Sequence, residues 1–463
     1  MSPFRYQSLG GGLDMTSDGT RPQMEPLGMR DSEKGGAASD FTGLAIQAAR
    51  QPWTWSGSDF VNSPNPDSFV IHLDNEDING IEEALAGFKK QELDGDEVNR
   101  NNFPLPTLQQ RLERAAIDIH QGCGFCIVRG VDPTRYSPED NLLIFLGIAD
   151  YIGDIRGVQD RKGNVISHIT DSSLWKVSHS LRHGIHTNAD LPFHNDMGTD
   201  LLALQVRQCA KKGGDTYVAS ASKLFCELVA TEPEAAQALL KPNWPIQISG
   251  NPARHVLAPL MQHHNGKIMT SLDPGRLGQH PTTTTTTTTT TGNPAPAPRP
   301  PFRSHPHDPP PPTRRPTNAT VPPLTPTQHH ALAALSAAAA KHRLRLPSRP
   351  GDVVFVNNWA LLHARDSYVD VDDDGDATTT TRRHLLRLWL RSSRLGWDVP
   401  AAMRAPWEAA FGAAGRAGRV RLYPVVPAPV YKVPKYTSGS AAFVIEESDG
   451  EGEGEMGMAR SEE

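Results

Sequence analysis

The segment PGDVVFVNNWALLHARDSY, residues 350–368, has the pattern of two apolar strands joined by a turn. Pro350, Gly351 and Asp352 are turn residues, and the pair at 357–358 interrupts the chain before the second strand. His363 stands near the end of that second strand. This position suits a ligand inside a barrel, and it also suits a buried core histidine. The segment predicts a mainly β fold.

The rest of the chain agrees with this prediction. Strands are expected over 125–131, 201–210, 215–220, 352–358, 360–369 and 383–390, with an early strand over 69–78. Helices are expected from a capping box at Thr107 to a stop at Gly122, and from a cap at Ser137 to about Tyr151. Two more are expected at 231–240, with Thr231 in its capping box, and at 328–343. The residues therefore predict an α+β, mainly β, domain.

Low-complexity tracts mark the expected boundaries of that domain. Residues 1–40 are rich in Gly, Ser and charge, and 447–463 form an acidic, Gly-rich tail, so both are predicted to be disordered. A Thr run and a Pro-rich tract at 281–324 cannot join a sheet or a helix. We expect one domain over 41–446 that is interrupted by this disordered insertion.

Composition excludes several functional classes. The 463 residues carry a net charge of -6 without a basic cluster, which argues against a nucleic-acid partner. Four cysteines are too few for a disulfide framework. The longest apolar run, 142–149, is too short to span a bilayer, and no signal peptide opens the chain. We expect a cytoplasmic protein without membrane contact, and its oligomeric state is left open.

The segment LPFHNDMGTD, residues 191–200, supplies two ligand-type side chains. His194 and Asp196 stand on alternate positions, so on an extended strand they project from one face. Two histidines and one carboxylate on one octahedral face suit non-haem Fe(II) and leave open positions. His363 is the best candidate for the second histidine. The alternative is a polar loop without a metal.

Several arginines interrupt the apolar segment TRRHLLRLWLR, residues 381–391. Arg383 and Arg387 share one face of the expected strand with Leu385, and buried guanidinium groups need anions. A small dicarboxylate would satisfy one of them, whereas an exposed edge strand would leave both in water. In the turn at 213–216, Thr216 would begin the next strand with its hydroxyl directed inside, unless the turn is a plain hairpin.

These motifs, in this order over about 110–280 and 325–400, resemble the TauD/TfdA family of taurine dioxygenase-like enzymes. The resemblance implies a double-stranded β-helix, or jelly roll, of the clavaminate synthase-like type with flanking helices. It further implies Fe(II), 2-oxoglutarate as co-substrate and O2. The implied reaction hydroxylates a small, anionic organic substrate, a sulfonate or carboxylate, and releases succinate and CO2.

The resemblance also implies roles for individual residues. His194, Asp196 and His363 match the catalytic metal ligands. Thr216 and Arg383 match 2-oxoglutarate contacts, and Arg387 is assigned to either the co-substrate or an anionic substrate. Further residues expected to line the substrate pocket are His186, Asn188, Asn195 and Trp359. The 20 residues from His363 to Arg383 are more than the family's usual spacing because of an acidic loop.

Two other functional classes fit part of the pattern. A jelly-roll binding or regulatory protein without turnover would keep the fold, but such decay usually removes a metal ligand, and all three are present. A zinc hydrolase of another fold would use the same His-Asp-His set. Such a hydrolase needs no dicarboxylate clamp, so Arg383, Arg387 and Thr216 argue against it.

Overall fold

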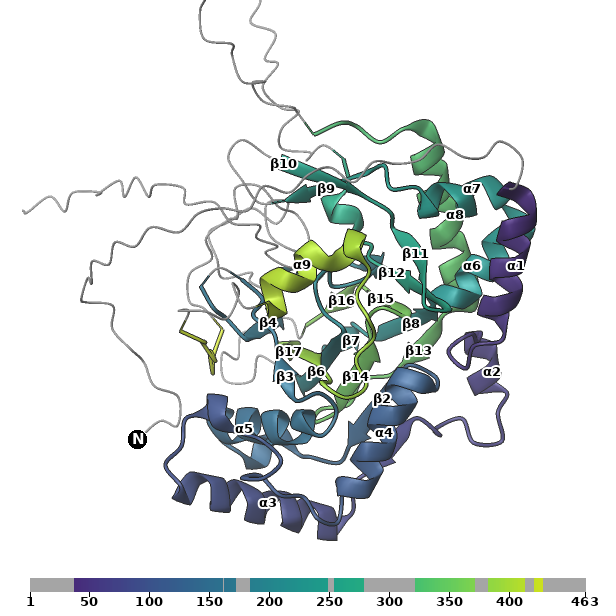
Figure 1. Cartoon of the computed structure of the whole chain (residues 1–463). Coiled ribbons are helices and arrows are strands. Elements are labelled where there is room, and N and C mark those ends of the chain that lie inside the picture. The colour runs from purple at the N-terminus through teal and green to yellow at the C-terminus, as the bar shows by residue number, and fades with distance from the viewer. Residues whose placement is uncertain are drawn as a thin grey trace, which may run out of the picture.

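Two β-sheets form the centre of the protein in the computed structural model (Figure 1). The structure describes residues 37–160, 162–171, 184–248, 254–278, 321–370, 382–412 and 420–427. The larger sheet has seven strands in the order β1-β2-β14-β6-β17-β3, with β4 also paired to β17. Its strands are β1 (Val70–His72), β2 (Phe125–Arg129), β3 (Ile155–Arg156), β4 (Ile166–Thr170), β6 (Leu201–Gln208), β14 (Val353–Asn357) and β17 (His384–Arg391).

The smaller sheet has four antiparallel strands in the order β13-β8-β15-β5. They are β13 (Leu344–Leu346), β8 (Thr216–Ser220), β15 (Leu361–Arg365) and β5 (Leu191–His194). The chain leaves β14 in the larger sheet and enters β15 in the smaller one through the Asn357–Asn358 turn. This crossing between facing sheets gives the predicted fold: α+β, mainly β, with a double-stranded β-helix core.

Alternation along β17 decides which side chains reach the interior between the sheets. Leu386, Leu388 and Leu390 pack against the helical layer, whereas Leu385 and Trp389 belong to the core between the sheets. The period of two follows from the pleat of a strand. Arg383 and Arg387, which share the odd-numbered face, are buried and line the cavity there, so the alternative of an exposed edge strand does not hold.

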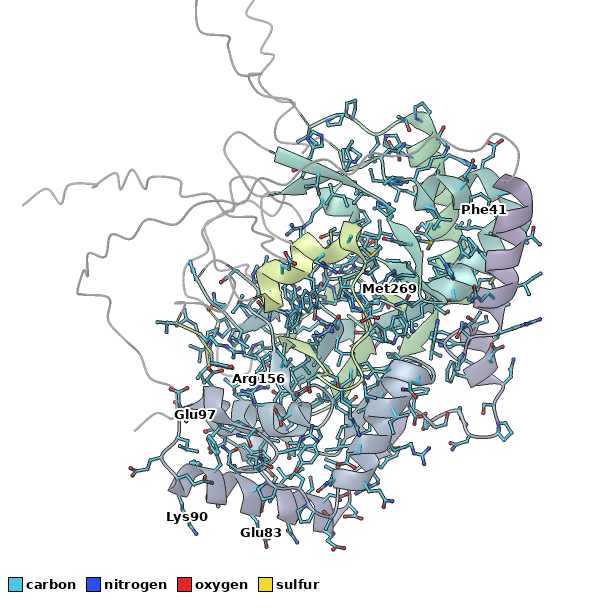
Figure 2. The ribbon with its side chains drawn as sticks, viewed as in Figure 1. Phe41, Glu83, Lys90, Glu97, Arg156 and Met269 are labelled. Carbon is cyan, nitrogen blue, oxygen red and sulfur yellow. The ribbon has the colours of Figure 1, made fainter. Side chains whose placement is uncertain are left out.

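Three helices cover the outer face of the larger sheet at its lower end in Figure 1. They are α3 (Asn75–Lys90), α4 (Gln109–Gln121) and α5 (Pro138–Asp150). Helix α5 is buried from Asn141 to Asp150, and its apolar side chains belong to the core that the sheet shares with these helices. Figure 2 shows Glu83 and Lys90 on the outer side of α3, where both are exposed.

A second helical group packs on the smaller sheet together with two hairpins. Its helices are α1 (Ala37–Ala49), α6 (Ala221–Thr231), α7 (Pro233–Leu240) and α8 (Pro326–His342). The hairpins pair β9 (Trp244–Ile248) with β10 (Arg254–Ala258), and β11 (Met261–His264) with β12 (Lys267–Thr270). Short elements complete the fold: α2 (Gly57–Val61), α9 (Ala401–Phe411), and the pair of β7 (Lys212–Gly213) with β16 (Tyr368–Val369).

Three local predictions were wrong. Thr107 caps no helix, because α4 begins at Gln109 after Leu108 and has no side-chain cap. Thr231 ends α6 instead of starting a helix, and α7 begins at Pro233, where the fixed φ of proline suits a first turn. The early strand covers only Val70–His72, since Asp74 then caps helix α3.

Several predicted segments lie outside the described residues. They include 1–36, the insertion over 281–320, the acidic loop over 371–381, and the tail at 447–463. The described chain begins with α1 at Ala37, ahead of the expected boundary at residue 41. Within the described part, no helix combines the length and the apolar character needed to cross a membrane.

Candidate metal centre

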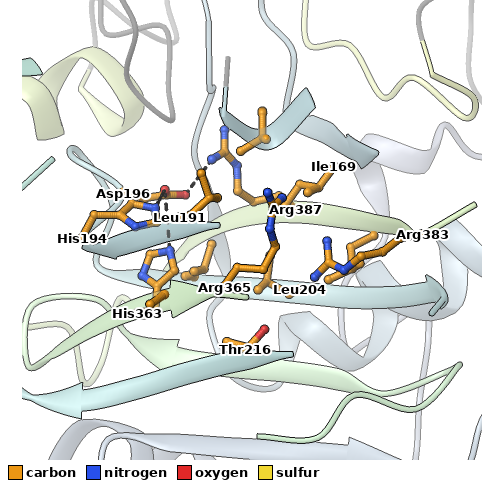
Figure 3. A pocket seen from close by; sticks show the side chains of 14 residues that line it. Ile169, Leu191, His194, Asp196, Leu204, Thr216, His363, Arg365, Arg383 and Arg387 are labelled. Atoms are coloured by element: carbon orange, nitrogen blue, oxygen red, sulfur yellow. Dashed lines mark ion pairs between the residues drawn. The ribbon is translucent and has the colours of Figure 1, made fainter. Parts of the chain in front are cut away.

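The two predicted histidines lie side by side across two strands of the smaller sheet. Strand β15 pairs with β5 in a register that sets His363 directly opposite His194. Their ring centroids are 4.2 Å apart and the ring planes are inclined by 45°. Figure 3 shows both rings directed toward Asp196. The chain thus brings together residues that are far apart in the sequence.

Asp196 completes the cluster from the segment that follows β5. Its Oδ1 is 4.0 Å from Nε2 of His194 and 4.0 Å from Nε2 of His363. All three side chains are buried, and one ligand atom from each lies within 4.8 Å of the others. This Oδ1 has no hydrogen-bond partner among the residues that the structure describes. A buried carboxylate oxygen without a partner between two imidazole nitrogens is the arrangement that a small cation satisfies.

The second oxygen of Asp196 is held by the larger sheet. Arg387 places Nη1 3.0 Å from Oδ2, and Trp389 donates its indole N–H to the same oxygen at 2.8 Å. Burial alone raises the pKa of the Asp196 carboxyl, but Arg387, the two histidines and Trp389 offset this, and the pKa lies below its usual value. Asp196 is therefore an anion at neutral pH.

Both histidines direct Nε2 toward Asp196. His194 Nδ1 lies 2.8 Å from the carbonyl of Pro192, which can only accept, so Nδ1 carries the proton and Nε2 carries the lone pair. Burial lowers the pKa of His363 to about 3, and the repulsion that a protonated His363 would meet from His194 and Arg387 adds to this effect. Metal ions bind neutral imidazole, so the chemistry of the set suits a metal at neutral pH.

Two asparagines fix the loop that carries Asp196. Asn195 donates its amide to the carbonyls of Asn358 and Leu361 at 2.7 and 2.9 Å, and its oxygen accepts from the Leu272 N–H. Asn358 bonds the backbone N–H and carbonyl of Asp196 at 3.0 and 2.8 Å. Both side chains are fully buried. They orient the carboxylate, a function that spacing in the sequence does not reveal.

The predicted anion-binding residues lie at the other end of the same cavity. Thr216 and Arg383 line it together with His194, Asp196 and His363. Thr216 does begin β8, but β6 and β8 belong to different sheets, so the turn between them is not a hairpin. Arg383 donates Nε and Nη2 to the carbonyl of Gly214 at 3.1 and 2.9 Å, while its buried Nη1 has no partner.

Arg365 also lines the cavity, although it was not among the residues predicted from the sequence. It lies opposite Thr216 in the pairing of β15 with β8, and its side chain lines the cavity. In Figure 3 it is drawn between His363 and Arg383. Its position was readable in principle, because residues 363 and 365 share one face of the strand.

Of the five residues predicted to contact substrate, only Arg387 lines this cavity. Asn195 has no exposed surface, and its side-chain amide donates to backbone carbonyls. Trp359 is buried in the core and donates its indole N–H to Asp200. Asn188 is exposed, and its carbonyl accepts from the N–H of Tyr368. Neither Asn188 nor His186 lines the cavity.

Comparison with known proteins decides the family. The family model described as "Taurine catabolism dioxygenase TauD, TfdA family" matches residues 88–389, which include every residue of the cluster. This chain belongs to the TauD/TfdA family. It is accordingly a 2-oxoglutarate-dependent dioxygenase, an oxidoreductase, and His194, Asp196 and His363 form its Fe(II) site.

Two relatives of this TauD/TfdA protein are similar over most of their length. "Taurine hydroxylase-like protein SAT17" from Stachybotrys chartarum is 30% identical over 363 residues, covering 77% of this chain and 83% of the relative. "FR-33289 synthase" from Streptomyces rubellomurinus is 23% identical over 316 residues, covering 67% of this chain and 81% of the relative.

Solved structures of oxygenases also resemble the chain. An asparagine oxygenase in complex with Fe(II), 3-hydroxyasparagine and succinate has a TM-score of 0.48 and 16% identity, covering 72% of this chain and all of that one. The non-haem iron oxygenase OrfP with Fe and α-ketoglutaric acid has a TM-score of 0.45 and 16% identity, covering 70% and 94%.

Proposed function

We propose that this TauD/TfdA protein hydroxylates a small organic substrate that bears a sulfonate or carboxylate group, with release of succinate and CO2. Bound Fe(II), together with 2-oxoglutarate and O2, would supply the oxidising power for the C–H bond. The protein's own residues hold the ion, orient both organic molecules and exclude water. The proposal rests on the charge of the cavity.

That charge is strongly positive. Three arginines, Arg365, Arg383 and Arg387, line the cavity against a single carboxylate, Asp196. Fe(II) adds two positive charges, and 2-oxoglutarate removes two. A net positive charge remains in a buried space where charges are weakly screened. An anionic substrate would offset it, whereas a cationic substrate would increase the repulsion.

Individual roles follow from position. We assign the metal to His194, Asp196 and His363, and the distal carboxylate of 2-oxoglutarate to Arg383 and Thr216. Arg387 pairs with Asp196 at 3.0 Å and donates its Nε–H to Oε1 of Gln159 at 2.8 Å. The positive charge of Arg387 is therefore mainly offset by the Asp196 carboxylate, and Arg387 would affect a substrate anion only through its electrostatic field.

The substrate would approach from a second cavity of about 140 Å³ on the other side of His194. Ile185, Leu191 and His194 line both cavities, and Asp273, Pro274 and Gly275 line only the second. The name of the Stachybotrys relative agrees with the proposed substrate class, because taurine is a small sulfonate.

The inactive-protein alternative has less support. All three ligands are buried and directed at one point, and the cavity between them and Arg383 is lined by polar groups suited to a dicarboxylate. Loss of turnover would relax the need for this arrangement. The zinc hydrolase alternative conflicts with the family to which the chain belongs.

Succinate formation tests the proposal. The purified protein with Fe(II), 2-oxoglutarate and O2 is given a panel of sulfonates, carboxylates, betaines and simple amines, with His363→Ala as the inactive control. We expect at least one small anion to produce succinate and hydroxylated product in equal amounts. Productive turnover of only cationic or neutral compounds would overturn the assignment of substrate class while leaving the dioxygenase activity intact.

A further inference from the structure

Two buried guanidinium groups stand next to each other at the end of the cavity away from the iron ligands. Arg365 and Arg383 are 6% and 3% exposed, and both contact the Tyr368 ring, with Cζ atoms 5.1 and 5.2 Å from its centroid. Both side chains remain cations at neutral pH.

Neither cation has an anionic partner among the described residues. Nε and Nη1 of Arg365 and Nη1 of Arg383 are buried without a hydrogen bond. By contrast, Arg387 in the same cavity is paired with Asp196. Two adjacent buried cations with three unused donors are costly unless an anion binds between them.

The two edges of the Arg365 guanidinium face different surroundings. Its Nη2 donates to the carbonyls of Thr187, at 2.9 Å, and Ala189, and it lies 3.5 Å from that of Gly184. These carbonyls belong to the segment 184–189, which begins with the 3-10 helix η4 (Gly184–His186). Ile185 of that segment lines both cavities. The other edge of Arg365 carries the unused Nε and Nη1 atoms.

Register places Arg365 at the co-substrate end. It is paired with Thr216 across β8 and β15, whereas the ligand His363, two residues earlier, is paired with Val218. Residues two apart on one strand share a face at a separation of roughly 7 Å. A five-carbon dicarboxylate chelated at the metal reaches about that far, so its distal carboxylate would arrive beside Arg365, Thr216 and Arg383.

We propose that Arg365 and Arg383 together hold the distal carboxylate of 2-oxoglutarate, and that Arg365 thereby fastens the segment 184–189 to the bound co-substrate. The inference rests on the proposed assignment of Arg383 and Thr216 and adds a second guanidinium to it. One consequence concerns the order of binding. 2-Oxoglutarate binds first and fixes the segment 184–189 in the wall of the second cavity, and the primary substrate enters afterwards.

Ligand truncation tests the clamp without turnover. Protein loaded with Ni(II) is titrated calorimetrically with 2-oxoglutarate and with 2-oxovalerate, which has the same chain length but lacks the distal carboxylate. Wild-type protein should prefer 2-oxoglutarate strongly. Arg365→Gln should weaken 2-oxoglutarate binding about 10- to 100-fold and leave 2-oxovalerate nearly unchanged. Arg383→Gln should behave alike, and the exposed Arg114→Gln on α4 should match wild type.

The outcomes separate the two proposals. If wild-type protein fails to prefer 2-oxoglutarate, the assignment of Arg383 and Thr216 fails as well. If wild type prefers it and Arg365→Gln keeps the full preference, only the clamp is overturned. Binding of 2-oxovalerate reports that a variant is folded. If Arg365→Gln no longer binds 2-oxovalerate, Arg365→Lys is used in its place, because lysine keeps the positive charge. Arg365→Lys is expected to reduce the preference for 2-oxoglutarate several-fold. An unchanged preference in Arg365→Lys would overturn the clamp.

Hydrogen exchange tests the fastening of the segment. In Ni(II)-loaded wild type, 2-oxoglutarate should slow amide exchange over 184–190, and 2-oxovalerate should not. In Arg365→Lys the slowing by 2-oxoglutarate should be reduced. Equal protection by both keto acids in wild type would contradict a link through the distal carboxylate.

Discussion

Arg387 and Asp196 form an ion pair 3.0 Å long in the interior of the protein, and this pair decides which carboxylate oxygen faces the two histidines. The guanidinium takes Oδ2, and Oδ1 is left between the two histidine rings. A strand of the larger sheet thereby orients a ligand that follows a strand of the smaller one. In this chain Arg387 is therefore paired with the carboxylate of the cluster.

Replacing Arg387 should make stability depend on metal. Arg387→Met leaves the Asp196 carboxylate buried and unpaired, so the metal-free protein should lose about 3–5 kcal/mol of unfolding free energy. A bound divalent ion restores the missing positive charge, and the stabilisation by metal should exceed that of wild type. Denaturant unfolding with and without Ni(II) measures both. Trp389→Phe, which removes one hydrogen bond to the same oxygen, is the control, and an equal metal effect in all three proteins would contradict the prediction.

Gly214 should be required for co-substrate binding. Its φ is +78°, which disfavours a side chain, and a Cβ there would lie 2.7 Å from Nε of Arg383. Gly214→Ala should therefore displace the guanidinium and weaken 2-oxoglutarate binding about tenfold or more, while metal affinity stays near wild type. Calorimetric titration of the Ni(II) protein gives both constants. Parallel loss of metal binding would show a wider disruption than the one predicted.

Asn195 should act on stability and metal binding without affecting substrate choice. Asn195→Ala leaves the Leu272 N–H and the carbonyls of Asn358 and Leu361 without their partner, at a cost of about 2 kcal/mol or more. We expect weaker metal retention and an unchanged order of preference across the substrate panel. A changed preference would place Asn195 in contact with substrate, as the sequence suggested.

A buried histidine pair should make the protein sensitive to acid. His168 donates Nε2–H to the Pro424 carbonyl at 2.9 Å, and its Nδ1 is 2.8 Å from Nε2 of His384. Burial lowers the pKa of His168 to about 4 and that of His384 to about 3, from 6.5. The unfolded chain then binds these protons first, so stability is complete above pH 6.5 and falls as the pH drops toward 4.

The size of this loss should be on the order of 5 kcal/mol between those pH values, about half of it from each histidine. His384→Gln keeps a donor for His168 and removes one titrating group. Its unfolding free energy should depend less on pH in this range than that of wild type, as chemical denaturation at a series of pH values would show. Parallel curves for the two proteins would exclude the pair as the source of acid sensitivity.

Local patterns predicted the strands that build the site. Alternation placed the apolar and arginine positions of β17 on opposite faces, and the turn at 357–358 correctly separated β14 from β15. The order of motifs predicted which residues would meet. His194, Asp196 and His363 are adjacent in space even though more than 160 residues separate the ends of the set.

Local sequence patterns could not predict which residues face one another across paired strands. Nothing near Arg365 in the sequence shows that it lies opposite Thr216. Nothing near Arg387 shows that its guanidinium forms an ion pair with Asp196. Asn195 looked available to a substrate because an asparagine in a polar segment usually is, but tertiary packing supplied three backbone partners. The misplaced caps at Thr107 and Thr231 have a similar origin, since several residues there suit a helix start and packing selects one.

Anaerobic addition of Fe(II) and 2-oxoglutarate to the purified protein tests the central claim most directly. The account predicts a weak visible charge-transfer absorption that requires both additions, is abolished in His194→Ala, and is weakened at a given 2-oxoglutarate concentration in Arg383→Gln. An absorption that is missing from wild type, or that persists unchanged in His194→Ala, would contradict the assignment of His194, Asp196 and His363 as the iron site.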